Sequence, residues 1–97
     1  MIDLIITARE VKGVCAAGIK AGDKIVLRGA TISLNETDIV CGSAFASIYP
    51  VIYAARYGKD LTELGLQERT VQCIDPGPPF NPKGGSVFFE IKPIIYE

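Results

Sequence analysis

Alternating apolar and polar residues at both ends of the chain predict β-strands. At the start, Ile2, Leu4, Ile6 and Ala8 alternate with Asp3, Ile5, Thr7 and Arg9, so every second side chain falls on one face. Near the end, Ser86–Lys92 repeats the pattern, and Pro93 limits this strand or places it at a sheet edge. Shorter strands are predicted at Lys24–Arg28, Thr31–Leu34 and Thr70–Ile74, with a polar turn at Asn35–Asp38.

The segment Ser43–Tyr57 changes to helical spacing and is the main predicted helix. Ser43 is the expected N-cap, and Gly58 suits the C-terminal cap. Pro50 removes a backbone hydrogen bond inside this helix, which predicts a kink there or two shorter helices. Apolar residues occupy two helix faces, with Ala44, Ile48, Val51 and Ala55 on one and Phe45, Tyr49 and Ile52 on the other. One more helical turn is expected at Asp60–Leu64, with Asp60 as cap and Gly65 as stop.

These elements predict an α+β fold in which a small, mostly antiparallel sheet packs against one main helix kinked at Pro50. We expect residues 1–97 to form a single domain, because 97 residues lie at the lower end of the single-domain range. An apolar fraction of 48% suffices for a packed core, and a charged fraction of 22% argues against disorder. The second apolar face of the helix is expected within this core or against another subunit.

Charge and hydropathy exclude some classes of partner. Ten basic and eleven acidic residues give a net charge of -1, so charge does not indicate binding to nucleic acid or to an anionic membrane. The longest later apolar run, Ile48–Ala55, is far shorter than the roughly 20 residues that span a bilayer. The start of the chain lacks the basic and apolar regions of a signal peptide, so we expect a cytoplasmic location.

Three cysteines, Cys15, Cys41 and Cys73, are the main candidates for function. An odd number without close pairs fits reduced thiols or a metal site better than a disulfide framework. Histidine is absent, which removes the commonest general base and the commonest nitrogen ligand for metals. The wide spacing of the cysteines matches neither a zinc ribbon nor a ferredoxin motif. Their positions in the fold are therefore more informative than their spacing.

All three cysteines stand near the ends of predicted elements. Cys15 lies in a glycine-containing loop, Cys41 just before the main helix, and Cys73 just before the proline-rich loop Asp75–Gly85. If these ends meet at one edge of the sheet, three thiolates can hold an iron–sulfur cluster with one open iron, or zinc with a fourth ligand from outside.

Two other interpretations of the cysteines stay open. Cysteine often behaves as a small apolar residue of the core, which needs no ligand. Alternatively, Cys41 acts alone as a reactive thiol, because helix amides and the helix dipole favour a thiolate at that place.

Other polar candidates have simpler structural explanations. Asp23 and Asp75 lie beside the cysteine loops, but turn aspartates commonly bond their own backbone. Arg56 and Tyr57 close the main helix, where a capping arginine is commoner than one that binds an anionic ligand.

A series of short motifs extends over nearly the whole chain. Cys15-x-x-Gly18-x-Lys20-x-Gly22-Asp23 is followed by Cys41, Ile48-Tyr49-Pro50, Ala55-Arg56-Tyr57-Gly58, Val71-Gln72-Cys73-x-Asp75-Pro76-Gly77 and the terminal strand after Gly84. In this order, the motifs resemble an uncharacterised family of small prokaryotic proteins. The resemblance implies that cysteines at these three positions belong to the family pattern, and it implies no activity. Many relatives carry histidine at the place of Ile19 and within Ala44–Ser47, and proline at the places of Gly42 and Ile74.

Together, these observations favour a small accessory or binding protein that holds a metal or an iron–sulfur cluster through Cys15, Cys41 and Cys73. We expect a homo-oligomer or a subunit of a larger complex, with no nucleic-acid or membrane partner. A thiol-dependent enzyme with Cys41 as nucleophile and a purely structural subunit are the alternatives.

Overall fold

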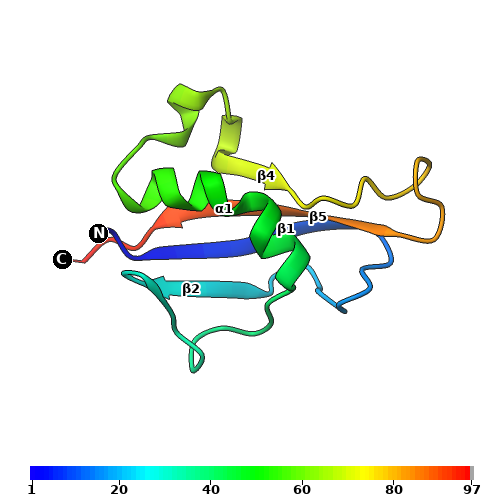
Figure 1. Cartoon of the computed structure of the whole chain (residues 1–97), viewed down its shortest axis with the longest axis horizontal. Helices are drawn as coiled ribbons and strands as arrows, with labels where there is room; N and C mark the ends of the chain where they lie inside the picture. Colours follow the sequence, from blue (N-terminus) through cyan, green and yellow to red (C-terminus); the bar gives the residue numbers. More distant parts are fainter. Residues whose placement is uncertain (97) are drawn as a thin grey trace.

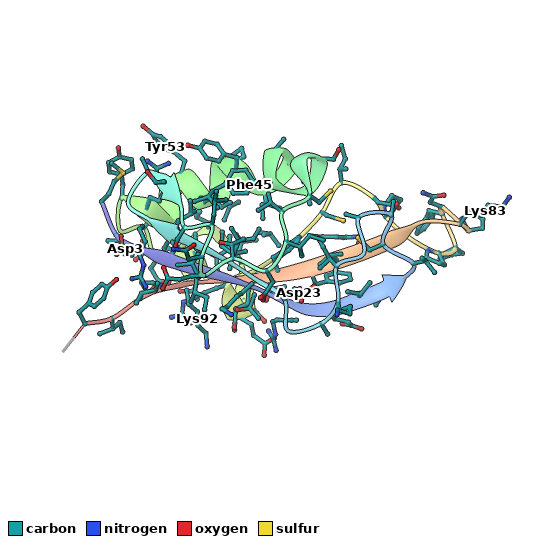
Figure 2. All side chains as sticks on the ribbon, turned by 90° about the horizontal axis from the view of Figure 1, so that it is seen from below. Asp3, Asp23, Phe45, Tyr53, Lys83 and Lys92 are labelled. Carbon is teal, nitrogen blue, oxygen red and sulfur yellow. The ribbon has the colours of Figure 1, made fainter. Side chains whose placement is uncertain are left out.

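A five-stranded antiparallel sheet carries one long helix on one of its faces (Figures 1 and 2). The computed structural model describes residues 1–96. The strands are β1 (Leu4–Gly13), β2 (Lys24–Arg28), β3 (Thr31–Ile32), β4 (Thr70–Gln72) and β5 (Gly85–Pro93), in the order β3-β2-β1-β5-β4. All neighbouring pairs are antiparallel. The predicted α+β fold is therefore confirmed.

The hydrophobic core lies between this sheet and helix α1 (Gly42–Arg56). Ile6 of the central strand β1 pairs with Ile25 of β2 on one side and with Ile91 of β5 on the other. Ile48 and Ile52 of α1 belong to the same buried cluster. Each aliphatic side chain of this size contributes roughly 1.5–3 kcal/mol when it is fully buried, so this layer fixes α1 on the sheet.

Strand β1 extends beyond the predicted alternation because it contains a bulge. The register against β5 shifts between Ala8 and Glu10, and a bulge of this kind redirects the side chains that follow it. Arg9, at the bulge, forms an ion pair with Glu68 at 2.9 Å. Val11 then pairs with the buried Val87, which carries β1 onward to Gly13 and the first cysteine loop.

Helix α1 starts earlier than its sequence predicts. Cys41 is the last extended residue and the N-cap, so the prediction of Ser43 as N-cap is wrong. The hydroxyl of Ser43 lies inside the first turn, and no side chain caps the helix. The helix is continuous through Pro50, which rules out two separate helices, and its ribbon changes direction partway along (Figure 1). Gly58, with φ of 88°, follows the C-cap Tyr57.

Two strands are shorter than predicted, and one short helix is additional. β3 stops at Ile32, and β4 stops at Gln72, so Cys73 lies just beyond its strand. The predicted turn after α1 is a 3-10 helix, η1 (Leu61–Leu64), with Asp60 and Gly65 as its caps, as expected. A second 3-10 helix, η2 (Gln67–Arg69), was not predicted. Within residues 1–96, no helix combines the length and the apolar character needed to cross a membrane.

Candidate functional site

All three cysteines line one pocket of about 270 Å³ at the amino end of α1. We call it the thiol pocket. Apart from the thiols, its lining is apolar except for Ser43 and Asp75. The small apolar residues of the lining were not predicted as site residues, because alanine, isoleucine and valine carry no local signal of function. Ile19 is one of them, so an aliphatic side chain from the Cys15 loop lines the pocket.

Cys15 is placed by a loop that folds back onto β1. The amide of Gly22 donates to the Ala8 carbonyl (2.7 Å), and the amide of Ala8 donates to the Asp23 carbonyl (2.8 Å), so the end of the loop is attached to the strand. The Asp23 carboxylate accepts from the amide of Lys20 at 2.8 Å. Asp23 therefore shapes its own turn, as its sequence context predicts.

Cys41 is placed by the helix itself. Its carbonyl accepts from the amide of Phe45 at 2.9 Å, which is the first hydrogen bond of α1. The N-cap side chain forms no hydrogen bond to the amides of the first turn, so these amides and the helix dipole act on the region where the Cys41 side chain lies. Both effects favour negative charge, including that of a thiolate.

Cys73 is placed by the end of β4, and its sulfur bonds to two backbone groups. The amide of Val87 donates to Cys73 Sγ at 3.3 Å. The Cys73 thiol is also 3.7 Å from the Asp75 carbonyl, to which it donates in its protonated form. The hydrogen bond from the Val87 amide can also form when the sulfur is a thiolate. Hydrogen bonds of this kind tune sulfur ligands in metal centres.

Asp75 lines the thiol pocket and stabilises the proline-rich loop through hydrogen bonds of its carboxylate. Its two carboxylate oxygens accept from the amides of Gly77 (2.8 Å) and Gly85 (3.3 Å), and both accept from Asn81 Nδ2. These hydrogen bonds, the one from Gly77 above all, lower the pKa of the Asp75 carboxyl. A carboxylate so engaged is a weak base and a structural group, as its sequence context predicts.

Close backbone packing brings this loop to the Cys15 loop. A Cβ atom at Gly85 would overlap the backbone of Val14 and Cys15, and one at Gly84 would overlap the side chains of Asp75 and Asn81. Gly85 therefore lets β5 begin directly against the chain segment that carries Cys15, and Gly84 lets the proline-rich loop pack closely on Asp75 and Asn81. The sequence shows the glycine pair, but only the structure shows what they approach.

The thiols share a pocket without converging on a single metal position. All three are free and half-buried, so the prediction of reduced thiols is consistent with the structure. Within residues 1–96, no group of three or more potential ligands is arranged to hold a metal ion. One tetrahedral zinc ion at about 2.3 Å from each sulfur requires such convergence.

The opposite end of α1 holds a different cluster of polar groups, which we call the tyrosine cluster. Arg56 is only 6% exposed. Its guanidinium donates to Tyr49 Oη and to Met1 Sδ, both at 2.8 Å, and lies over the rings of Tyr53 and Tyr57. Its Nε has no hydrogen-bond partner, and no acidic side chain within residues 1–96 forms an ion pair with it. The helix carbonyls therefore do not hold Arg56, contrary to the capping role that was expected.

No protein-family model matches this chain, and no curated protein or solved structure has detectable similarity to it. The function of the thiol pocket therefore has to be inferred from the residues that line it.

Proposed function

We propose that the protein is a small accessory protein that carries an iron–sulfur cluster on Cys15, Cys41 and Cys73. The observation that supports this proposal is that three cysteines from three separate loops line one pocket. Thiolates are the usual protein ligands of such clusters. Burial in the core does not by itself explain why all three cysteines of this chain meet in one pocket, because each of them is only half-buried.

Within residues 1–96, no group of three or more potential ligands is arranged to hold a single metal ion. The proposed cluster would take its thiolate ligands on several iron atoms, from Cys15, Cys41 and Cys73 around a space of about 270 Å³.

The backbone around the pocket favours thiolate ligands. Cys41 lies at the amino end of α1, where unoccupied amides favour negative charge. Cys73 Sγ accepts from the Val87 amide. The pocket contains no lysine or arginine, so these backbone groups are the local source of positive potential.

Anaerobic reconstitution with iron and sulfide tests this proposal. The wild-type protein should bind both elements in fixed ratio and show visible absorption typical of a cluster. Cys15→Ser, Cys41→Ser and Cys73→Ser should each lose more than about tenfold in occupancy, because even changes beyond the ligands cost about 10–100-fold in metal affinity. Ser47→Ala, a change on the exposed part of α1 outside the pocket, should retain the cluster.

The same experiment has a clear negative outcome. If the folded wild-type protein takes up no iron and sulfide, or if the cysteine variants take up as much as the wild type, the proposal is wrong. Circular dichroism of each variant separates loss of a ligand from loss of the fold.

A thiol-dependent enzyme with Cys41 as nucleophile is the second candidate, favoured by the position of Cys41 at the helix terminus. The pocket offers it no evident base, since the chain lacks histidine and Asp75 is fully engaged. This candidate requires Cys41 of the metal-free protein to react with iodoacetamide much faster than Cys15 and Cys73 near neutral pH. Equal, slow alkylation of all three excludes it.

A further inference from the structure

A buried positive charge without a counter-ion lies at the carboxyl end of α1. Arg56 is only 6% exposed, and none of the ion pairs formed within residues 1–96 includes it. The rings of Tyr53 and Tyr57 lie 5.6 and 5.9 Å from its guanidinium carbon and offset part of the charge, but these contacts supply no hydrogen-bond acceptor. Because arginine is almost never fully buried unless it is paired, the tyrosine cluster lacks an acidic group.

The open hydrogen-bonding positions of Arg56 lie on one edge of its guanidinium. Nη1 donates to Tyr49 Oη at 2.8 Å, which leaves the edge formed by Nε and Nη2. On that edge, Nε has no partner within residues 1–96, and Nη2 donates to Met1 Sδ. A thioether is a weak acceptor, whereas two parallel N–H groups on one edge match the two oxygens of a carboxylate. The edge that suits a carboxylate is therefore occupied by a weak substitute.

Met1 can leave this edge without loosening the fold. Its side chain has several rotatable bonds, and the residue is 66% exposed. The amide of the next residue, Ile2, donates to the Arg56 carbonyl at 2.8 Å, so the backbone stays attached to the end of α1 when the Met1 side chain turns away. Rotation of the thioether away from Nη2 opens this edge of the guanidinium.

An open hollow adjoins the same two tyrosines. It has a volume of about 620 Å³ and is lined by Tyr53, Ala54, Tyr57, Gly58, Lys59 and Leu64. Tyr53 and Tyr57 are 51% and 60% exposed, and Tyr53 lies on the side of α1 that points away from the sheet (Figure 2). Exposed tyrosines of this kind are enriched at protein interfaces. Lys59 already pairs with Glu63 at 2.8 Å, so Arg56 is the cation beside this hollow that has no counter-ion within residues 1–96.

We infer that a segment of a different protein docks on the tyrosine cluster and places a carboxylate on the Nε–Nη2 edge of Arg56, with a neighbouring apolar side chain in the hollow. In the free protein the tyrosine cluster supports α1, and the docked segment adds the acidic group that the cluster lacks. Pairing of α1 with α1 of a second copy does not fit, because this helix contains no aspartate or glutamate and supplies no carboxylate. The inference concerns the end of α1 opposite the thiol pocket and does not depend on the proposed cluster.

Two peptides and a free carboxylate test the chemistry of this partner. The probes are acetyl-Leu-Glu-Leu-amide, acetyl-Leu-Gln-Leu-amide and sodium acetate, each titrated into isotope-labelled wild-type protein that is followed by NMR. The glutamate peptide should bind more than about tenfold more tightly than the glutamine peptide, because hydrogen bonds between charged groups are the strong ones. It should also shift the Nε–H resonance of Arg56, which the glutamine peptide should leave in place. Acetate should bind at least about tenfold more weakly than the glutamate peptide, since it buries no apolar side chain.

Variants separate the carboxylate contact from the apolar contact. Arg56→Lys keeps the charge but removes the planar pair of N–H groups, so the preference for the glutamate peptide should fall to about threefold or less. Arg9→Lys is the matched control, because Arg9 is exposed and pairs with Glu68, and it should keep the full preference. Leu64→Ser changes a half-exposed residue of the hollow and should weaken both peptides by about threefold while the preference stays. Circular dichroism checks that each variant is folded.

Each contrary result overturns a stated part of the inference. Equal affinity of the wild type for the two peptides, or an Arg56 Nε–H resonance that the glutamate peptide does not move, overturns the carboxylate site. A full preference in folded Arg56→Lys places the carboxylate elsewhere, with the same consequence. Acetate that binds as tightly as the glutamate peptide overturns docking of a protein segment. A wild-type dimer in sedimentation that Leu64→Ser dissociates assigns the surface to a second copy and overturns the choice of a different protein. None of these measurements involves iron or sulfide, so failure of this inference is distinct from failure of the proposed function.

Discussion

The two ends of α1 hold their polar side chains in different ways. At the carboxyl end, the guanidinium of Arg56 is buried and contacts Met1 and the tyrosines of the cluster. At the amino end, Cys41 belongs to a pocket whose thiols do not bond to one another. Figure 2 shows Tyr53 on the side of α1 that points away from the sheet, so the tyrosine cluster also covers part of the outer face of the helix.

This difference separates a structural cluster from a candidate site. The guanidinium of Arg56 donates within the tyrosine cluster, to Tyr49 and Met1, while its buried Nε has no partner within residues 1–96. The cysteines are positioned by backbone, by Asp75 and by close glycine contacts, and their side chains face an open pocket. A binding site requires reactive groups that the surrounding structure holds in position while their own bonding capacity stays free. Changes at the two ends therefore test the comparison directly.

The largest effect is expected from a change in the backbone that shapes the thiol pocket. In Gly85→Ala, the added Cβ overlaps the backbone of Val14 and Cys15, where no flexible side chain can move away. We expect a loss of about 3 kcal/mol or more in the free energy of unfolding, since overpacking against fixed backbone is among the most costly substitutions. Chemical denaturation followed by circular dichroism measures it.

Gly42→Ala is the matched control for this substitution. Gly42 also adjoins the pocket, but a Cβ there meets nothing within 4 Å, and it lies in the first turn of α1. Alanine should be neutral or stabilise by up to about 1 kcal/mol. Similar stability of the two variants would show that the contact between β5 and the Cys15 segment does not hold the pocket in place.

A smaller loss of stability is expected at the other end of α1. Arg56→Ala removes the packing of the guanidinium on Tyr53 and Tyr57 and leaves Tyr49 Oη without its donor. The cost should be about 2 kcal/mol, whereas Cys41→Ser should cost less than about 1 kcal/mol because Cys41 is only half-buried. Equal losses of unfolding free energy in the two variants, measured by the same denaturation, would contradict this comparison. The carboxyl end of α1 would then be no more structural than the amino end.

The sequence predicts most of the fold because periodicity reflects burial. Ile6, Ile91 and Ile52 all belong to apolar patterns, and all lie in the core. The N-cap was wrong, because the preference of serine for caps is local, whereas the point at which Cys41 leaves the extended conformation depends on the whole connection from β3. Arg56 was misjudged because its contacts with Met1 lie more than fifty residues away in sequence.

The candidate site was predictable in part. Element ends suggested that the cysteines meet, and the pocket agrees with this. The alternation of residues gives neither the pocket volume nor the arrangement of the thiols, because both depend on how loops from β1, β4 and β5 pack together. Ile74 shows the same limit, since an exposed side chain that lines a pocket has no signature in a single sequence.

The smallest effect should come from acid, which acts at the thiol end through Asp75. Hydrogen bonds, above all from the amide of Gly77, hold the pKa of Asp75 below its usual value of 3.8. The carboxylate therefore stabilises the folded loop fully above about pH 3.8, and this contribution is lost as pH falls through the lower folded pKa. No carboxylate within residues 1–96 pairs with Arg56, so acid removes no such contact from the tyrosine cluster. Amide exchange should then show falling protection of Gly77 and Gly85 below about pH 3.8, while Tyr57, whose amide bonds the Ala54 carbonyl, keeps its protection.

Asp75→Asn is the control, because it keeps the size of the side chain and removes its titration. In this variant, the protection of Gly77 and Gly85 against amide exchange should be lower than in the wild type at neutral pH. It should also lose the fall below about pH 3.8 that titration of Asp75 causes in the wild type. A parallel loss of protection at Gly77, Gly85 and Tyr57 in the wild type would mean that the whole fold opens at once. In that case Asp75 does not secure the thiol end separately, and the two ends of α1 are one cooperative unit.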